Sequence, residues 1–207
     1  MTQSMDNLVS GLERLGKVAK QDKHLQFNNL MHHITPALLL DAFNKLNKQA
    51  ARGVDGLCWQ DYGRDCEQRL LILHEQLQSG RYKPKPVKRQ WLPKGNGEQR
   101  AIGITSLEDK IVQQALVQVL EPIYEADFLG FSYGFRPNRS QHQALDAVYM
   151  MVSFKKVSWV LDADLKGFFD NIDHACLLRQ IRHRICDERV LKLIASWLTA
   201  GVMDGHT

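Results

Sequence analysis

The sequence lacks the features that mark membrane, secreted or low-complexity proteins. No apolar run approaches the roughly 18 residues of a membrane-spanning helix, and the opening MTQSMDNLVSGLERLG contains no apolar signal-peptide core. Internal repeats are also missing. Of the 207 residues, 44% are hydrophobic and 24% charged, as in ordinary globular proteins. We therefore expect a cytoplasmic globular protein without membrane contact, built as one large domain or two small ones sharing a core.

Cysteine is sparse, with four thiols at Cys58, Cys66, Cys176 and Cys186. They form no C-x-x-C pair and show no zinc-ligand spacing with the eight histidines. Four scattered thiols suit a reducing compartment, where they serve as small core or surface residues. We expect no structural metal.

Acidic residues are scarce between positions 81 and 100, which read RYKPKPVKRQWLPKGNGEQR. This stretch has seven Lys or Arg and a single acid, Glu98. Such a segment suits a polyanion, because neutralising phosphates releases counterions. A solvated basic loop is the alternative, and the aromatic Tyr82 and Trp91 favour nucleic acid because they can stack on bases.

The first eighty residues have the periodicity of helices. Apolar residues recur every three or four positions at 8–18 and 37–46, and again at 61–78, where Leu70, Leu73 and Leu77 face inward and Gly80 is the stop signal. The two glycines of GVDG at 53–56 indicate a turn between the second and third helices.

From residue 81 the pattern is mixed. VKRQWLP and QRAIGIT flank GNGE, which predicts a β-hairpin. The sequence from Ser106 to Asp109 predicts a capping box that opens a helix, and Pro122 should kink or shorten that helix. Further helices are expected at 140–154, from Asp173, and at 187–201, with a strand at 157–165. This order predicts an α+β fold in which the strand at 157–165 has few partners.

The segment VLDADLKGFFDNIDH, residues 160–174, holds the clearest chemical signal. In a strand, Asp162 and Asp164 face the same way, while Val157, Trp159, Leu161, Ala163 and Leu165 face a core. Paired carboxylates offer hard oxygen ligands for Mg²⁺, although a strand with one solvated face would also carry acids. Together with cations from Lys94 and Arg100 and an aromatic surface from Phe169, they suggest phosphoryl or nucleotidyl transfer.

Three longer strings carry a family resemblance. PKGNGEQRAIGITSLEDKIVQQAL, YGFRPNRSQHQAL and VLDADLKGFFDNIDH occur in the order and spacing of group II intron reverse transcriptases, and bacterial retron-type enzymes share part of the pattern. The upstream GVDG fits as well. The resemblance runs from about residue 30 to the end of the sequence.

The resemblance implies a right-hand polymerase fold. Residues 1–80 would be an α-helical N-terminal extension, 81–155 the fingers with the hairpin, and 156–207 the start of the palm with the strand of the first catalytic aspartate. It also implies an RNA-directed DNA polymerase that joins dNTPs to a DNA primer on an RNA template, using two Mg²⁺ ions in the complete enzyme.

Individual roles follow by matching positions to the family motifs. Asp164 matches the first catalytic aspartate and metal ligand, and the backbone carbonyl of Leu165 would be a further ligand. Phe169 matches the steric-gate aromatic beneath the sugar, and Lys94 and Arg100 match the residues that grip the incoming triphosphate. Template or other nucleic-acid contacts are expected from Arg136, Arg139, Lys83, Lys85, Lys88 and Arg89.

Other residues of the 160–174 segment are given structural roles. Asp162 would support Asp164, Asp170 would orient a turn or cap a helix, and His174 would pack at a helix start. The Tyr-x-Asp-Asp string that supplies the remaining carboxylates in reverse transcriptases does not occur in these residues. We therefore expect that this chain alone does not polymerise DNA.

Two alternatives remain open. The first is an intron RNA-binding, maturase-type splicing factor, which needs no Asp-Asp hairpin. The second is an inactive remnant that folds poorly and exposes an apolar face because sheet partners are missing.

Overall fold

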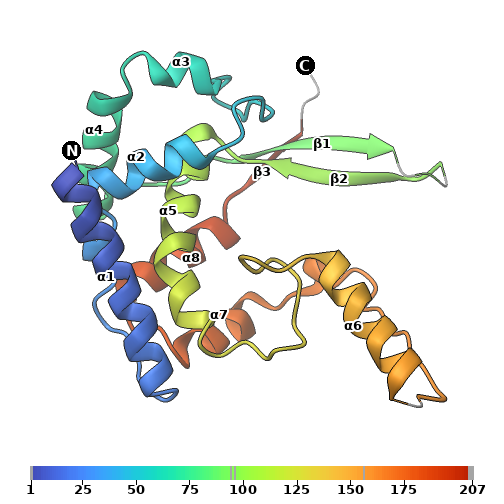
Figure 1. The fold of residues 1–207 in the computed structure, drawn as a ribbon. Helices are drawn as coiled ribbons and strands as arrows, with labels where there is room; N and C mark the ends of the chain where they lie inside the picture. The colour runs from blue at the N-terminus through green and yellow to red at the C-terminus, as the bar shows by residue number, and fades with distance from the viewer. Residues whose placement is uncertain (1, 94, 96, 156, 205–207) are drawn as a thin grey trace.

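A computed structural model describes residues 2–93, 95, 97–155 and 157–204. It has a mixed α+β fold that is mostly helical with one small sheet, as the sequence predicts (Figure 1). Within the described residues the elements are α1 (Thr2–Gln21), η1 (Met31–His33), α2 (Pro36–Lys45), α3 (Trp59–Gly63), α4 (Cys66–Gln78), β1 (Val87–Pro93), β2 (Gln99–Ile104), α5 (Leu107–Tyr124), α6 (Gln141–Phe154), η2 (Phe169–Asn171), α7 (His174–Arg182), α8 (Glu188–Leu198) and β3 (Val202–Asp204).

The hydrophobic core lies around α5, which α1 and α2 cover. The inner face of α5 is buried, including Ile111 and Val119, and α5 ends two residues after Pro122. Helix α2 begins where Thr35 accepts a hydrogen bond from the Leu38 N–H at 3.2 Å and Pro36 occupies the first turn. The apolar faces predicted for these helices are the ones that are buried, because burying such a stripe stabilises the fold.

One predicted helix is two helices in the structure. Instead of a single helix at 61–78, α3 ends at Gly63 and α4 begins at Cys66. Glycine favours ending a helix because it loses the most backbone freedom when it is ordered. The inward-facing leucines predicted for α4 are buried, and Gly80 ends this region with a φ of 69°.

The GVDG turn packs against the start of α5. Gly56 donates its N–H to the Gly53 carbonyl at 3.2 Å and has a φ of 67°, so the predicted turn is confirmed. A Cβ on Gly53 would lie 2.6 Å from the Thr105 carbonyl oxygen. Gly53 is therefore required because two backbone segments approach closely.

Helices α7 and α8 are tied to the N-terminal region by buried polar groups. The Arg184 guanidinium donates hydrogen bonds to the carbonyls of Ala19, Asp22 and Leu25 at 2.9–3.1 Å. Its Nε lies 2.9 Å from an Asp127 carboxylate oxygen, as an ion pair whose N–H direction is not aligned. The Asp187 carboxylate caps α8, as predicted, and also accepts hydrogen bonds from backbone N–H groups of η1.

The predicted β-hairpin is confirmed. β1 pairs antiparallel with β2, so that Trp91 lies opposite Ala101 and Leu92 opposite Arg100. The hairpin projects away from the helices (Figure 1). β3 adds to the other edge of β1 in parallel and gives the order β2-β1-β3. The sequence analysis missed β3 because a three-residue strand has too little periodicity.

The prediction of a strand at 157–165 is wrong for this structure. These residues have no regular secondary structure, and the side chains expected in a core are exposed, with Trp159 at 90% and Leu161 at 91%. A strand needs a second segment to accept and donate its backbone hydrogen bonds, and the described residues pair with none of it. Helix α6, which was predicted at 140–154 and begins with a capping box formed by Ser140 and Gln143, likewise has no buried residue.

Candidate functional site

The loop around Asp164 closes on itself through local hydrogen bonds. Gly167 has a φ of 62°, which reverses the chain before η2. Asn171 donates its backbone N–H to the Gly167 carbonyl at 3.2 Å and its side-chain amide to the same oxygen at 2.7 Å. Asp170 lies in the first turn of η2, and its predicted role of orienting a turn or capping a helix stays a prediction. His174 is the first residue of α7 and is exposed.

Asp164 and Phe169 line one open surface hollow of about 550 Å³. The backbone and side chains of residues 163–165 and 167–170 form it, so Leu165 also belongs to it whereas Asp162 does not. The Phe168 and Phe169 rings meet edge to face with centroids 5.4 Å apart. Asp164 and Phe169, which the sequence analysis paired, therefore line the same hollow.

A complete metal site is not assembled in the described part of the chain. There, no three His, Cys, Asp or Glu side chains are grouped so that they could hold an ion. Asp164 and Leu165, the two residues predicted to hold the metal, both line the hollow, and Mg²⁺ requires near-octahedral oxygen coordination. These residues fit part of a magnesium site, and the other ligands would have to come from elsewhere.

The β1–β2 hairpin presents exposed cations on one face. Arg100 lies opposite Leu92, and Lys88 lies four residues before Leu92 on β1, so both cations point to the same side of the sheet. Both are exposed, and within the described residues neither side chain has a hydrogen bond or ion pair. Lys94 lies outside the described residues. Arg100 and Lys88 are thus available to an anion.

Two other predicted nucleic-acid ligands form ion pairs with aspartates of the same chain. Lys85 Nζ lies 3.6 Å from Oδ2 of the buried Asp55, and an Arg89 guanidinium nitrogen lies 3.1 Å from an Asp204 oxygen on β3. Lys83, in contrast, is exposed. The basic segment therefore divides into cations that hold the fold and cations that face solvent.

Arg136 is also turned inward. Its guanidinium makes a two-point pair with the Glu125 carboxylate, both bonds 2.9 Å long, and donates to the carbonyls of Leu129 and Ser132 at 2.8 Å. The hydrogen bonds from Arg136 lower the pKa of Glu125. With 6% of its side chain exposed, Arg136 shapes the loop between α5 and α6. Arg139 is exposed, and its guanidinium carbon lies 5.5 Å from the centroid of the Tyr133 ring.

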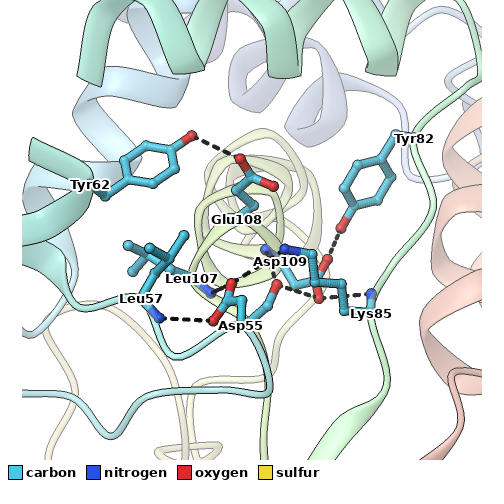
Figure 2. A network of polar contacts seen from close by, with 9 residues as sticks. Asp55, Leu57, Tyr62, Tyr82, Lys85, Leu107, Glu108 and Asp109 are labelled. Atoms are coloured by element: carbon cyan, nitrogen blue, oxygen red, sulfur yellow. Dashed lines mark hydrogen bonds and ion pairs between the residues drawn. The ribbon is translucent and has the colours of Figure 1, made fainter. Parts of the chain in front are cut away.

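A polar network at the base of the hairpin escaped the sequence analysis (Figure 2). Ser106 does begin α5 as predicted and accepts from the Asp109 N–H. The Asp109 carboxylate, however, accepts from the Tyr82 hydroxyl and, at 3.1 Å, from the Lys85 N–H. Burial and the hydrogen bond to Asp109 raise the pKa of Tyr82. The signal in the sequence was Pro84-Lys85-Pro86, where one N–H must find an acceptor.

These features define a class of protein. It is an α+β protein with a projecting basic hairpin and an exposed loop that carries both a carboxylate and an aromatic ring. The sequence pattern of the family "Reverse transcriptase (RNA-dependent DNA polymerase)" matches residues 92–207, more than half of the chain. The chain belongs to this family, and it is of the group II intron type by its relatives.

Two of the relatives match nearly the whole chain. It is 37% identical to protein YkfC of Escherichia coli over 205 residues, which are 95% of this chain and 54% of that protein. It is 32% identical to the group II intron-encoded protein LtrA of Lactococcus lactis subsp. cremoris over 195 residues, 93% of this chain and 32% of that protein. Nuclear intron maturase 2 of Arabidopsis thaliana is 32% identical over 99 residues, 48% of this chain and 13% of that protein.

The chain spans about half the length of YkfC and about a third of LtrA. The family resemblance drawn from the three sequence motifs is thereby confirmed. In the described residues, no helix has the length and apolar character to cross a membrane.

Proposed function

We propose that this chain provides the helical extension (1–80), the fingers (81–155) and the first part of the palm (156–207) of an RNA-directed DNA polymerase of group II intron type. The reaction is attack of a DNA primer 3′-hydroxyl on the α-phosphate of a dNTP, with an RNA template and with pyrophosphate leaving. Family membership supports the reaction class. The relatives' greater length means that other segments supply the rest of the active site.

The observation that carries the proposal is the shared hollow of Asp164 and Phe169. A polymerase needs a metal-binding carboxylate next to a surface that orients the sugar of the nucleotide. In the complete enzyme, Asp164 and the Leu165 carbonyl would be ligands of magnesium, which neutralises phosphate charge. Phe169 would lie beneath the sugar and disfavour a 2′-hydroxyl.

Cations of the hairpin would bind the triphosphate. Arg100 is exposed and, among described residues, unpaired, so its guanidinium can form two parallel hydrogen bonds to phosphate oxygens. Lys94 would join it. Nucleic-acid contacts would come from the exposed Lys83, Lys88 and Arg139. We expect Lys85, Arg89 and Arg136 to contribute by holding the fold.

Nucleotide binding tests the hairpin assignment on the chain itself. The probe is a fluorescent dATP analogue with Mg²⁺, titrated against the chain and its Arg100→Ala variant. We expect Arg100→Ala to weaken binding about tenfold, as loss of a charge-assisted contact does. Arg14→Ala removes an exposed arginine from α1, far from the hairpin, and serves as the matched control (Figure 1). Equal loss in both variants would contradict the assignment.

Primer extension tests the role of Asp164. The source DNA is sequenced beyond the Thr207 codon, and the chain is expressed both alone and with any continuing reading frame. We expect extension on an RNA template only from a longer product that contains a Tyr-x-Asp-Asp motif, and its loss in Asp164→Ala. Extension by the pure 207-residue chain that Asp164→Ala abolishes would contradict the expectation that this chain alone is inactive.

A second function, intron RNA binding in support of splicing, is favoured by exposed basic residues and an exposed aromatic residue in the segment that leads into β1 and forms it. Lys83 and Lys88 face solvent, and Trp91 is 52% exposed. With a group II intron RNA as the probe, the Lys83→Gln, Lys88→Gln double variant should weaken binding, whereas Asp164→Ala should not. Equal binding by the double variant and the parent chain would exclude this surface.

A further inference from the structure

The segment that enters the hairpin is a stiff strap, defined here as residues 81–86. Its first two backbone N–H groups, of Arg81 and Tyr82, donate to the Gln76 carbonyl at the end of α4. Proline at 84 and 86 fixes two φ angles and restricts the residue between them to extended conformations. Within 84–86, Lys85 therefore has the only N–H, and that N–H is donated to Asp109 at 3.1 Å.

Asp109 anchors the strap to α5. The residue is 2% exposed, and its carboxylate accepts from the Ser106 hydroxyl at 2.7 Å as well as from the strap. The Tyr82 hydroxyl, which donates to the same carboxylate, accepts from the Trp197 indole N–H of α8 at 3.2 Å. The strap and α5 thus meet at one buried carboxylate, and α8 joins them through the Tyr82 hydroxyl.

Asp55 provides a second anchor for the same lysine. Its side chain is 5% exposed, and Oδ2 lies 3.6 Å from Lys85 Nζ and accepts from the Leu107 N–H at 3.4 Å. Oδ1 accepts from the Leu57 N–H. Lys85 is consequently held by its backbone through Asp109 and by its ammonium through Asp55, as Figure 2 shows.

The hairpin magnifies any movement at this anchor. β1 begins two residues after Lys85, and the hairpin projects from the body (Figure 1). At about 3.3 Å per residue, a seven-residue strand is about 23 Å long, so a rotation of about 10° at its base would move its far end by about 4 Å. A displacement of that size exceeds the tolerance of a phosphate contact.

We propose that Asp109 and Asp55 are positioning residues that set the direction of the β1–β2 hairpin, and through it the location of Arg100. The inference that these two residues orient the hairpin rests only on the hydrogen bonds and the ion pair that they form. Its consequence for dNTP binding rests on the proposed function.

Hydrogen exchange of backbone amides tests the orientation. Asp109→Asn keeps the shape of the side chain but replaces one of its two acceptor oxygens by an NH2 donor, so that Tyr82 on one side and Lys85 with Ser106 on the other can no longer all donate to it. Asp55→Asn removes the charge facing the Lys85 ammonium. We expect peptides covering 87–104 to exchange at least about tenfold faster in Asp109→Asn, while the core helix α2 keeps its protection. Glu108→Gln is the matched control, because Glu108 neighbours Asp109 on α5 but accepts its hydrogen bond from Tyr62, and among the described residues it has no hydrogen bond to the strap.

Nucleotide affinity separates a positioning role from a merely structural one. With the fluorescent dATP analogue and Mg²⁺, we expect Asp109→Asn to raise the Kd about tenfold. The same substitution should add little once Arg100→Ala is present, because both act through Arg100. Independent, additive losses would overturn the link between Asp109 and Arg100.

The remaining outcomes decide the proposal as well. Unchanged exchange at 87–104 in both Asn variants, with α2 intact, would overturn it. The parent chain itself could fail to bind dATP while residues 87–104 exchange faster in Asp109→Asn. That result would support the hairpin anchor and count against the proposed function. If Asp109→Asn does not fold, Lys85→Gln and Tyr82→Phe are judged by the same exchange criterion, because they remove single contacts to the two carboxylates and leave both aspartates in place.

Discussion

Two regions of this chain are equally rich in apolar residues and opposite in burial. Around α5, residues such as Ile111 and Val119 are 0% exposed, whereas between positions 128 and 169 Phe135 is 102% and Leu161 91% exposed. The first region packs α1 and α2 against α5. The second includes α6, which buries none of its residues. Burial is thus set by the surface available to cover an apolar residue as well as by its own hydrophobicity.

The polar groups show the same contrast. Asp173 and Asp187 both cap helices, but Asp173 is exposed and accepts from one N–H of its own helix. The Asp187 carboxylate is buried and also accepts from Leu30 and Met31 at 2.7 and 3.0 Å. An aspartate at a helix start therefore makes more hydrogen bonds where the helix is packed against another element than where it is exposed.

Core truncation gives the largest expected difference between the two regions. Ile111→Ala should lower the free energy of unfolding by about 2–5 kcal/mol, because it removes buried methylenes and leaves a cavity. Leu161→Ala should change it by less than about 0.5 kcal/mol, because that side chain is already in solvent. Urea denaturation followed by circular dichroism measures both. Equal destabilisation would mean that 157–165 is packed in solution.

Removing the two caps gives the next largest difference. Asp187→Ala leaves buried N–H groups of η1 and α8 without an acceptor and should cost about 3 kcal/mol. Asp173→Ala should cost about 1 kcal/mol, the usual value for an exposed N-cap. The same denaturation experiment applies. A smaller loss for Asp187→Ala than for Asp173→Ala would show that α8 is not held to η1 as described.

Glycine substitution compares backbone packing. Gly53→Ala places a Cβ within 3 Å of backbone atoms of Thr105 and Ser106 and should cost about 1–3 kcal/mol, as overpacking does. The control is Gly134→Ala in the exposed region, where a Cβ meets nothing within 4 Å. Thermal unfolding should show a lower midpoint for the first variant only. If Gly53→Ala is neutral, the GVDG turn is less tightly packed against α5 than the distances indicate.

The smallest expected effect is a dependence on pH. Burial would raise the pKa of Asp187, but hydrogen bonds from the N–H groups of Met31, Leu30, Arg189 and Val190 outweigh it, and the pKa is lowered. The stability that the carboxylate contributes is therefore present above its unfolded pKa and lost as the pH falls through its folded pKa.

Asp187→Asn isolates this contribution. The variant should be less stable than the parent chain near neutral pH. The difference should shrink as the pH falls below about 4, the ordinary pKa of an Asp in the unfolded chain, towards the lowered pKa of the folded chain. Denaturation midpoints of both proteins between about pH 7 and pH 3 provide the measurement. A difference that stays constant over this range would assign the effect of the substitution to shape and not to charge.

Much of the fold could be predicted from local signals. Ser140, Asp173 and Asp187 mark helix starts that the structure confirms, and the residues flanking GNGE form the expected hairpin. Of the candidate site, the proximity of Asp164 and Phe169 could be predicted, because they lie only five positions apart in the chain. The functional roles of these two residues remain predictions.

Other features depended on partners far away in the sequence. Arg89 and Lys85 belong to one basic run, yet Arg89 pairs with Asp204, 115 residues later, and Lys85 with Asp55. Nothing in the run itself distinguishes them from Lys83 and Lys88. The inward turn of Arg136 and the anchoring role of Asp109 were hidden for the same reason.

By itself, the sequence determined the helices, their caps, the hairpin and the family. The hydrogen bonds of a helix and the turn of a β-hairpin form within a short segment, so nearby residues suffice to specify them. Only the tertiary structure decided the lack of a strand at 157–165, the addition of β3 and which cations remain free. Each of these depends on whether a distant segment supplies a hydrogen-bond partner or a countercharge, and no local pattern contains that information.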